Sequence, residues 1–165
     1  MSTFVFINKY TVGSGGSSSV TFSSIPQTYT DLVVMYSARS SAAGLYTGVS
    51  VSLNGSGSNF SYIAFQGTGS SSVSFGAASN YYGEANASTS ASNTFNNSSI
   101  YFHNYTSSDY KSFLVDNVME TNATTTYADH YTGLWSNTSA ITSVTISISS
   151  MVQYSSFYLY GIKKG

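Results

Sequence analysis

The sequence predicts an all-β protein, an antiparallel β-sandwich of jelly-roll type with about ten to twelve short strands. Ser, Thr, Val, Ile, Tyr and Phe dominate the composition, whereas the helix-favouring Leu, Glu, Lys and Arg are scarce. Apolar and hydroxyl side chains alternate with a period of two in several segments, and runs of Gly, Ser and Asn separate those segments. The length of 165 residues fits one domain, residues 1–165.

The clearest alternation lies in residues 49–53 and 144–148, where Val, Leu and Ile alternate with Ser and Thr. Each of these segments predicts a strand with one dry face and one hydroxyl-rich face. Asn54-Gly55 follows the first and favours a hairpin turn. We expect further strands near residues 20–22, 59–66, 73–75, 80–85, 96–104, 110–119, 127–135 and 154–162.

Two segments, residues 4–7 and 32–36, are continuously apolar. Such a run is typical of a strand that is buried on both faces. Because residues 4–7 lie at the start of the chain, we expect a neighbouring subunit or another protein to cover Phe4 and Phe6. The Gly-rich residues 13–19 are interpreted as a long hairpin loop before the next strand.

Charge is unusually sparse, at 7% of the residues with a net charge of −1. A typical soluble domain carries roughly 25% charged residues, and a near-zero net charge favours association. The composition therefore predicts a structural protein that binds to other protein subunits, most simply as a homo-oligomer.

Cysteine is absent, which excludes disulfides, thiol catalysis and thiolate metal sites. The sequence has neither a long apolar stretch nor a signal-peptide pattern, so no membrane partner is expected.

Few residues offer catalytic or metal-binding chemistry. The histidines are His103 and His130, and no Gly-x-Ser-x-Gly nucleophile motif accompanies them. Asp116 and Glu120 lie four residues apart on one strand face, whereas glycoside hydrolysis needs two carboxylates facing each other. We expect no enzyme activity, no cofactor and no metal, with a Ser/His/Asp site or a calcium loop as alternatives.

The five basic residues, Lys9, Arg39, Lys111, Lys163 and Lys164, are too scattered to follow a phosphate backbone. Nucleic-acid binding is therefore not expected. Arg39 follows the apolar segment 32–36, which suggests a strand-end ion pair or an interface contact.

Tyrosine is abundant, with 15 copies, and two of them are adjacent at Tyr81 and Tyr82. Tyrosine is enriched at protein interfaces, stacks on sugar rings and also covers sheets, and the sequence leaves these three roles open. The interface residues that we predict are Phe4, Phe6, Arg39, Tyr81 and Tyr82.

Several segments resemble a known family: SSIPQTYTDLVV (23–34), SARS (37–40), LNG (53–55), NYTSS (104–108), GLWSNT (133–138) and YLYGI (158–162). They are similar to segments of small virion structural proteins of tailed bacteriophages, which are capsid decoration (cement) proteins or distal pieces of tail fibres. The resemblance extends from about residue 18 to residue 162. It implies a β-sandwich on a virion and supplies no catalytic residue.

These observations lead to the expectation of a non-enzymatic decoration protein that docks on the major capsid protein and stabilises the assembled phage head. Its location would be the virion, assembled in the host cytoplasm, and the resemblance favours a trimer. The alternative is a tail-fibre or receptor-binding module that recognises host surface glycan. A free carbohydrate-binding or hydrolytic protein is a third possibility, but secretion and acid-pair signals are missing.

Overall fold

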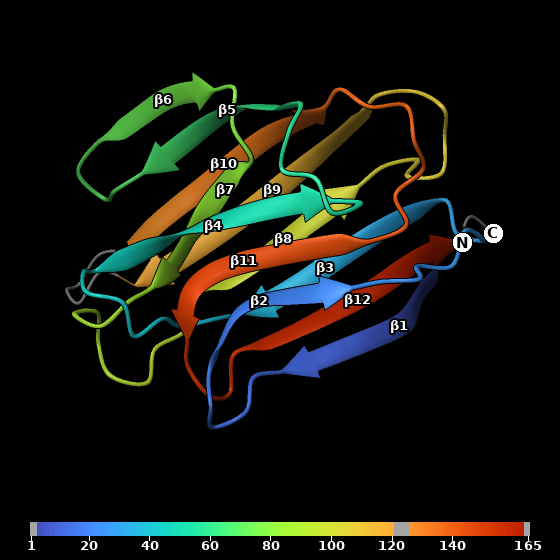
Figure 1. The fold of residues 1–165 in the computed structure, drawn as a ribbon. Coiled ribbons are helices and arrows are strands. Elements are labelled where there is room, and N and C mark those ends of the chain that lie inside the picture. The colour runs from blue at the N-terminus through green and yellow to red at the C-terminus, as the bar shows by residue number, and fades with distance from the viewer. Residues whose placement is uncertain (1–2, 121–125, 164–165) are drawn as a thin grey trace.

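The computed structural model describes residues 3–120 and 126–163, which form twelve antiparallel strands and no helix (Figure 1). The strands make two facing sheets, which confirms the all-β sandwich. In order across the larger sheet, the strands are β1 (Thr3–Thr11), β12 (Ser156–Lys163), β3 (Asp31–Ser37), β8 (Asn97–Phe102), β9 (Lys111–Glu120), β10 (Thr126–Trp135), β5 (Phe60–Gly67) and β6 (Ser72–Ala77). The smaller sheet contains β2 (Ser17–Phe22), β11 (Val144–Met151), β4 (Tyr46–Leu53) and β7 (Tyr81–Asn86).

The strand order is that of a jelly roll with additions. The smaller sheet runs β2-β11-β4-β7, and the larger one contains β3-β8 and β5-β6, which together give the eight strands of the jelly roll. The β9–β10 hairpin is inserted between β8 and β5, and β1 and β12 extend the larger sheet beyond β3. As a result the larger sheet has eight strands and the smaller one only four. Because β1 pairs with β12, both ends of the described chain lie side by side (Figure 1).

The core lies between the sheets and follows from the period-two alternation. In β11, Val144, Ile146 and Ile148 are buried, while the intervening Thr145 and Ser147 are half-buried. The same alternation buries Val49, Val51 and Leu53 of β4. The strands predicted from these segments are confirmed, with their dry faces turned toward the larger sheet.

An aromatic cluster fills the core beneath β5, β7, β9 and β10. The ring of Tyr82 lies 4.8 Å from that of Phe113, and Trp135 stacks on Phe60 at 6.2 Å. Gly133 allows this packing, because a Cβ atom there would lie 2.5 Å from the Phe113 ring. Phe113 and Tyr82 therefore occupy the space that any larger residue at position 133 would need.

Two expected hairpins are wrong. Asn54 and Gly55 do form a tight turn, with φ angles of 52° and 77°. The chain then crosses to the other sheet, since β4 belongs to the smaller sheet and β5 to the larger. The expected loop over residues 13–19 is shorter, since β2 begins at Ser17, and it likewise connects strands in different sheets. From β1 to β5 the successive strands alternate between the two sheets, so a turn signal between two of them does not imply that they pair.

The two continuously apolar segments are not buried throughout. In β3, Leu32 and Val34 face the core, and Val33 is covered on the other side, but Met35 is 41% exposed. In β1, Phe4 and Phe6 are each 54% exposed. Both departures lie on the same side of the larger sheet, the side that faces away from the smaller sheet.

Candidate interaction face

The outward side of the eight-stranded sheet is exposed and largely apolar. Residues paired across neighbouring strands point to the same face, so the pairings define rows across the sheet. One row runs from Phe6 through Tyr160, Val33, Tyr101, Leu114 and Thr132 to Ile63. The next runs from Tyr158 through Met35, Ser99, Asp116 and His130 to Phe65. We call this surface the outward face.

Most of the large apolar side chains exposed in the described chain belong to the outward face. Within β9, Phe113 and Val115 point into the core. Leu114 and Val118 point to the opposite side, where they are 43% and 47% exposed. The exposed large apolar residues of the outward face are Phe4, Phe6, Met35, Ile63, Phe65, Leu114, Val118, Leu134 and Tyr158. A concentration of this kind marks an interaction surface in soluble proteins.

Charge on the outward face is confined to a few positions. Near its centre, Asp116 accepts a hydrogen bond from the His130 ring, with 2.7 Å between Oδ1 and Nδ1. At one end, Asp31 contacts His103 at 3.0 Å and accepts hydrogen bonds from the Tyr101 hydroxyl and the Asn104 N–H. Each of these carboxylates has a partner, and the exposed Lys9 lies at the β1 edge of the face.

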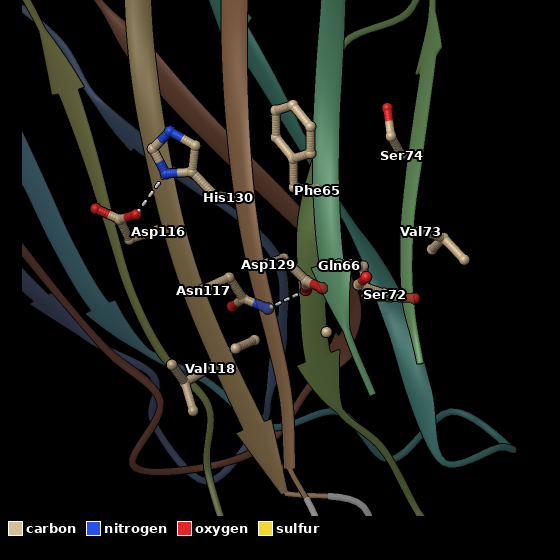
Figure 2. Close-up of a pocket in the computed structure, with 12 residues that line it drawn as sticks. Phe65, Gln66, Ser72, Val73, Ser74, Asp116, Asn117, Val118, Asp129 and His130 are labelled. Carbon is tan, nitrogen blue, oxygen red and sulfur yellow. Dashed lines mark hydrogen bonds and ion pairs between the residues drawn. The ribbon is translucent and has the colours of Figure 1, made fainter. Parts of the chain in front are cut away.

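An open hollow of about 630 Å³ lies on the outward face where β5, β6, β9 and β10 meet (Figure 2). Phe65 and Val118 supply apolar side chains to its lining, and Asp116 and His130 supply polar atoms. Figure 2 shows the Asp116–His130 hydrogen bond within it. The hollow is open to solvent, as a contact site for a protruding side chain or a sugar ring would be.

The His130–Asp116 pair lacks the third member of a nucleophilic triad among the described residues. Ser74 is the hydroxyl residue next in the row, but Phe65 stands between it and His130 in the cross-strand register. A serine nucleophile has to be hydrogen-bonded to the histidine that removes its proton.

A second polar cluster is buried between the sheets. Asn117 Nδ2 donates to Asp129 Oδ2 at 2.9 Å, and Asn96 Nδ2 donates to Asn117 Oδ1 at 2.9 Å. Close to them, Glu84 Oε1 accepts from the Tyr81 hydroxyl at 3.2 Å. Glu84 is 7% exposed and Asp129 4%, and within the described residues neither Glu84 Oε2 nor Asp129 Oδ1 has a hydrogen-bond partner. These two carboxyl groups have no basic side chain bonded to them in that part of the chain.

Burial raises the pKa of Glu84 from 4.5 to about 7, with the charge of Asp129 as the second cause. The Tyr81 hydrogen bond opposes this shift without cancelling it. At pH 6 the folded protein therefore holds Glu84 mainly as a neutral acid. The cluster acts as a polar part of the core, enclosed by the sheets and turned away from the outward face.

The predicted interface residues fall into two groups. Phe4 and Phe6 lie on the outward face, where both rings meet Tyr160 edge-on at 6.3 and 6.0 Å. Tyr82, by contrast, is 0% exposed, and its hydroxyl donates to the Ser61 carbonyl. Tyr82 is thus a core residue, because its side chain lies between the sheets. Tyr81 is half-buried and binds Glu84.

Arg39 does not form the expected ion pair among the described residues. Its guanidinium group is half-buried and donates to the Ser90 hydroxyl and to the carbonyl oxygens of Ser90, Ala91 and Thr94. Arg39 therefore fixes the loop between β7 and β8. Lys111 is also buried, with its ammonium group bonded to the carbonyls of Ser107 and Asp109, while Lys164 lies outside the described residues.

Sequence reasoning missed the central apolar residues of the outward face, namely Ile63, Phe65, Leu114 and Val118. One signal in the sequence could have indicated them. Residues 113–115 are all apolar, so apolar side chains point to both faces of that strand. No group of three or more His, Cys, Asp or Glu side chains in residues 3–120 and 126–163 could hold a metal ion. The same residues contain no helix that is long and apolar enough to span a membrane.

Comparisons with protein-family models, with curated proteins and with solved structures found no match for this chain. The resemblance to phage virion proteins thus stays a prediction based on the segments quoted above.

We expect the buried cluster to make stability depend on pH through Glu84. Its pKa is higher in the folded state than its ordinary value, so its stabilising contribution is complete below pH 4.5 and is lost as the pH rises to about 7. The loss should be on the order of 3 kcal/mol, at about 1.4 kcal/mol per pKa unit. Urea unfolding of the Glu84→Gln variant should lack this part of the pH dependence, and the variant should exceed the wild type in stability at pH 8.

The exposed Asp109 gives the matched control, since Asp109→Asn removes a carboxylate without touching the cluster. This control should retain the wild-type slope between pH 4.5 and 7. A Glu84→Gln variant with an unchanged slope would show that Glu84 titrates normally in the folded protein.

Proposed function

We propose that this chain is a non-enzymatic virion structural protein, a capsid decoration protein that docks through the outward face and stabilises the assembled head. The observation that carries the proposal is the outward face itself, which is broad, apolar and nearly free of unpaired charge. The family resemblance of the quoted segments supplies the virion context. The partner would be the major capsid protein or another protein of the shell.

The outward face has the size that a specific protein contact requires. Eight strands about 4.8 Å apart span roughly 35 Å, and strands of about eight residues are roughly 26 Å long, which gives an area of roughly 900 Å². A standard interface covers about 800 Å² on each partner. A docked shell protein would therefore cover most of the face.

The polar residues of the outward face suit a protein that is soluble before it docks. Ser99, Ser112 and Thr132 place hydroxyl groups between the apolar side chains. Hydroxyl groups can hydrogen-bond to water in the free state and to a partner's backbone in the bound state. They avoid the desolvation cost that a buried, unpaired charge would add.

The hollow supports a second candidate function, a tail-fibre or receptor-binding module that recognises glycan. Phe65 offers a ring on which a sugar could stack, and Asp116 and His130 offer hydrogen-bonding atoms beside it. The tyrosine platform first considered for this role is not suitable, because Tyr82 is buried. Under this alternative the hollow would bind a host surface sugar.

A charge at the centre of the outward face should weaken docking. In Leu114→Asp, a carboxylate would have to enter the contact without a partner, and we expect at least a tenfold loss of affinity for particles that lack the protein. The measurement is cosedimentation of the purified variant with those particles. Because Leu114 is exposed in the free protein, the Leu114→Asp variant should keep the fold of the wild type and an unfolding temperature close to it.

The control places the same charge on the other layer, as Ser19→Asp on the exposed side of β2. This variant should bind the particles like the wild type. If Ser19→Asp weakens binding and Leu114→Asp does not, the protein docks through the smaller sheet and the proposed face is wrong.

The two candidate functions predict opposite phenotypes for particles that lack the protein. A decoration protein binds the assembled shell in many copies and stabilises it by mass action. Deletion particles should therefore assemble and adsorb to hosts, but rupture at lower temperature or under weaker osmotic shock. Sturdy deletion particles that fail to adsorb would overturn the capsid proposal and favour the receptor-binding module.

A further inference from the structure

Strand β6 is an open edge of the larger sheet. All six of its residues, Ser72–Ala77, are exposed, and the strand pairs with β5 in continuous register without a bulge. The opposite edge differs in two ways. Strand β1 has a register shift between Phe6 and Asn8, and it also contains the charged residue Lys9. Bulges and lysines are the devices by which edge strands avoid pairing with other chains. β6 has neither.

The other two edges, in the smaller sheet, are also less available. β7 packs against β9 and β10, and five of its six residues are buried. The pairing of β2 with β11 contains a register shift between Ser147 and Met151. Among the described edges, β6 is the one that is regular, uncovered and uncharged.

Two apolar side chains of β6 lack a cover on the inward side of the sheet. Val73 and Phe75 pair with Gln66 and Ala64 and share their inward direction, yet they are 47% and 36% exposed. The reason is that the smaller sheet has only four strands and ends at β7. Phe75 contacts Tyr62 and Tyr131 on one side, at ring distances of 6.2 and 6.1 Å, and is open on the other.

We propose that β6 pairs antiparallel with β6 of a second copy of this chain, about a two-fold axis perpendicular to the sheet. With such an axis, the outward faces of the two copies lie on the same side of the joined sheet. A residue that points outward in one copy must therefore pair with a residue that points outward in the other, and the same holds for inward residues. With Ser74 opposite its counterpart, Val73 of one copy lies opposite Phe75 of the other. The contact then contains two identical Val73–Phe75 pairs, one on each side of the axis, and in each pair the two apolar side chains cover each other. Such duplication is the rule in an isologous contact.

Charge explains why the partner should be an identical copy. Residues 40–83, which include β5, β6 and their loops, contain no Asp, Glu, Lys, Arg or His. Two copies therefore approach at this edge without like-charge repulsion. A different protein with a charged strand would find no complementary group here.

The edge contact also joins the two outward faces into one continuous surface. Ser72, Ser74 and Gly76 carry small side groups on the outward side, so the join would not be blocked there. An edge of six residues is smaller than a standard interface, so we expect a weak, concentration-dependent dimer in solution. The proposal does not depend on the capsid assignment, because its test needs the purified chain alone.

The absence of cysteine makes the test direct. In Ser74→Cys, the two introduced thiols would face each other across the two-fold axis. Directly opposed residues of antiparallel strands have Cα atoms about 4.5–5.5 Å apart, which lies within the range that a disulfide spans. Mild oxidation should give a disulfide-linked dimer as the main product. Ser19→Cys places a thiol at the β2 edge of the smaller sheet and should stay mainly monomeric under the same conditions.

Analytical ultracentrifugation gives an independent readout. The wild type should show a dimer whose fraction rises with concentration. Val73→Lys should shift it to the monomer, because each ammonium group would lie against Phe75 of the other copy, with the second ammonium group diagonally across the contact. Val73→Thr keeps the side-chain shape without adding a charge and should still dimerise.

Three results would overturn the proposal: equal crosslinking of the two cysteine variants, no crosslinking of Ser74→Cys, or wild-type association of the Val73→Lys protein. A three-subunit mass that survives Val73→Lys would instead favour the trimer expected from the resemblance.

Discussion

An eight-stranded sheet packed against a four-stranded sheet has more apolar surface than its partner layer can cover. The β9–β10 insertion and the added β1 and β12 widen the larger layer, while the smaller layer keeps the four strands of the jelly roll. Two features follow from this difference in width. The inward side chains of β6 extend beyond the smaller sheet, and no layer formed by residues 3–120 and 126–163 covers the outward face. Both surfaces are places where another protein can supply the missing layer.

The low charge of the chain is consistent with this architecture. A sheet that is to be covered on both sides would bury most of its charged residues, at a cost that only good partners offset. Among the charged groups of the larger sheet, Asp116 is paired with His130, Asp129 is turned into the core, and the exposed Lys9 lies on the edge strand β1. Glu84, in the smaller sheet, is kept largely neutral near pH 6 by a raised pKa. Hydroxyl groups provide most of the remaining polarity, and no charged residue lies in the row from Phe6 to Ile63.

The fold class could be predicted from the sequence because alternation is a local property. Residues 49–53 and 144–148 show which side chains of a strand point to the core, and the strand count favours the jelly roll. Pairing partners are not local, which is why Asn54-Gly55 predicted a hairpin where the chain changes sheets. Phe4 and Phe6 are predicted to need a cover from another protein because residues 4–7 are continuously apolar, and both rings are exposed on the edge strand β1.

The centre of the outward face could not be predicted in the same way. In β9 the apolar residues occupy both parities, with Phe113 and Val115 on one side and Leu114 and Val118 on the other. A sequence window presents such a strand as buried on both sides. Which side lacks a cover depends on how many strands the facing sheet contains, and that number is set by strands far away in the chain. The burial of Tyr82 was missed for the same reason, since its environment is built by β5, β9 and β10.

The central claim is that the uncovered side of the larger sheet is the docking surface. The most direct measurement is a cryo-electron microscopy map of the virion at a resolution that separates the two sheets of the bound protein. The account predicts that the eight-stranded sheet lies against the shell, with Leu114, Val118 and Phe65 in the contact and the four-stranded sheet facing solvent. A map in which the four-stranded sheet or the loops contact the shell, with the outward face open to solvent, would contradict it.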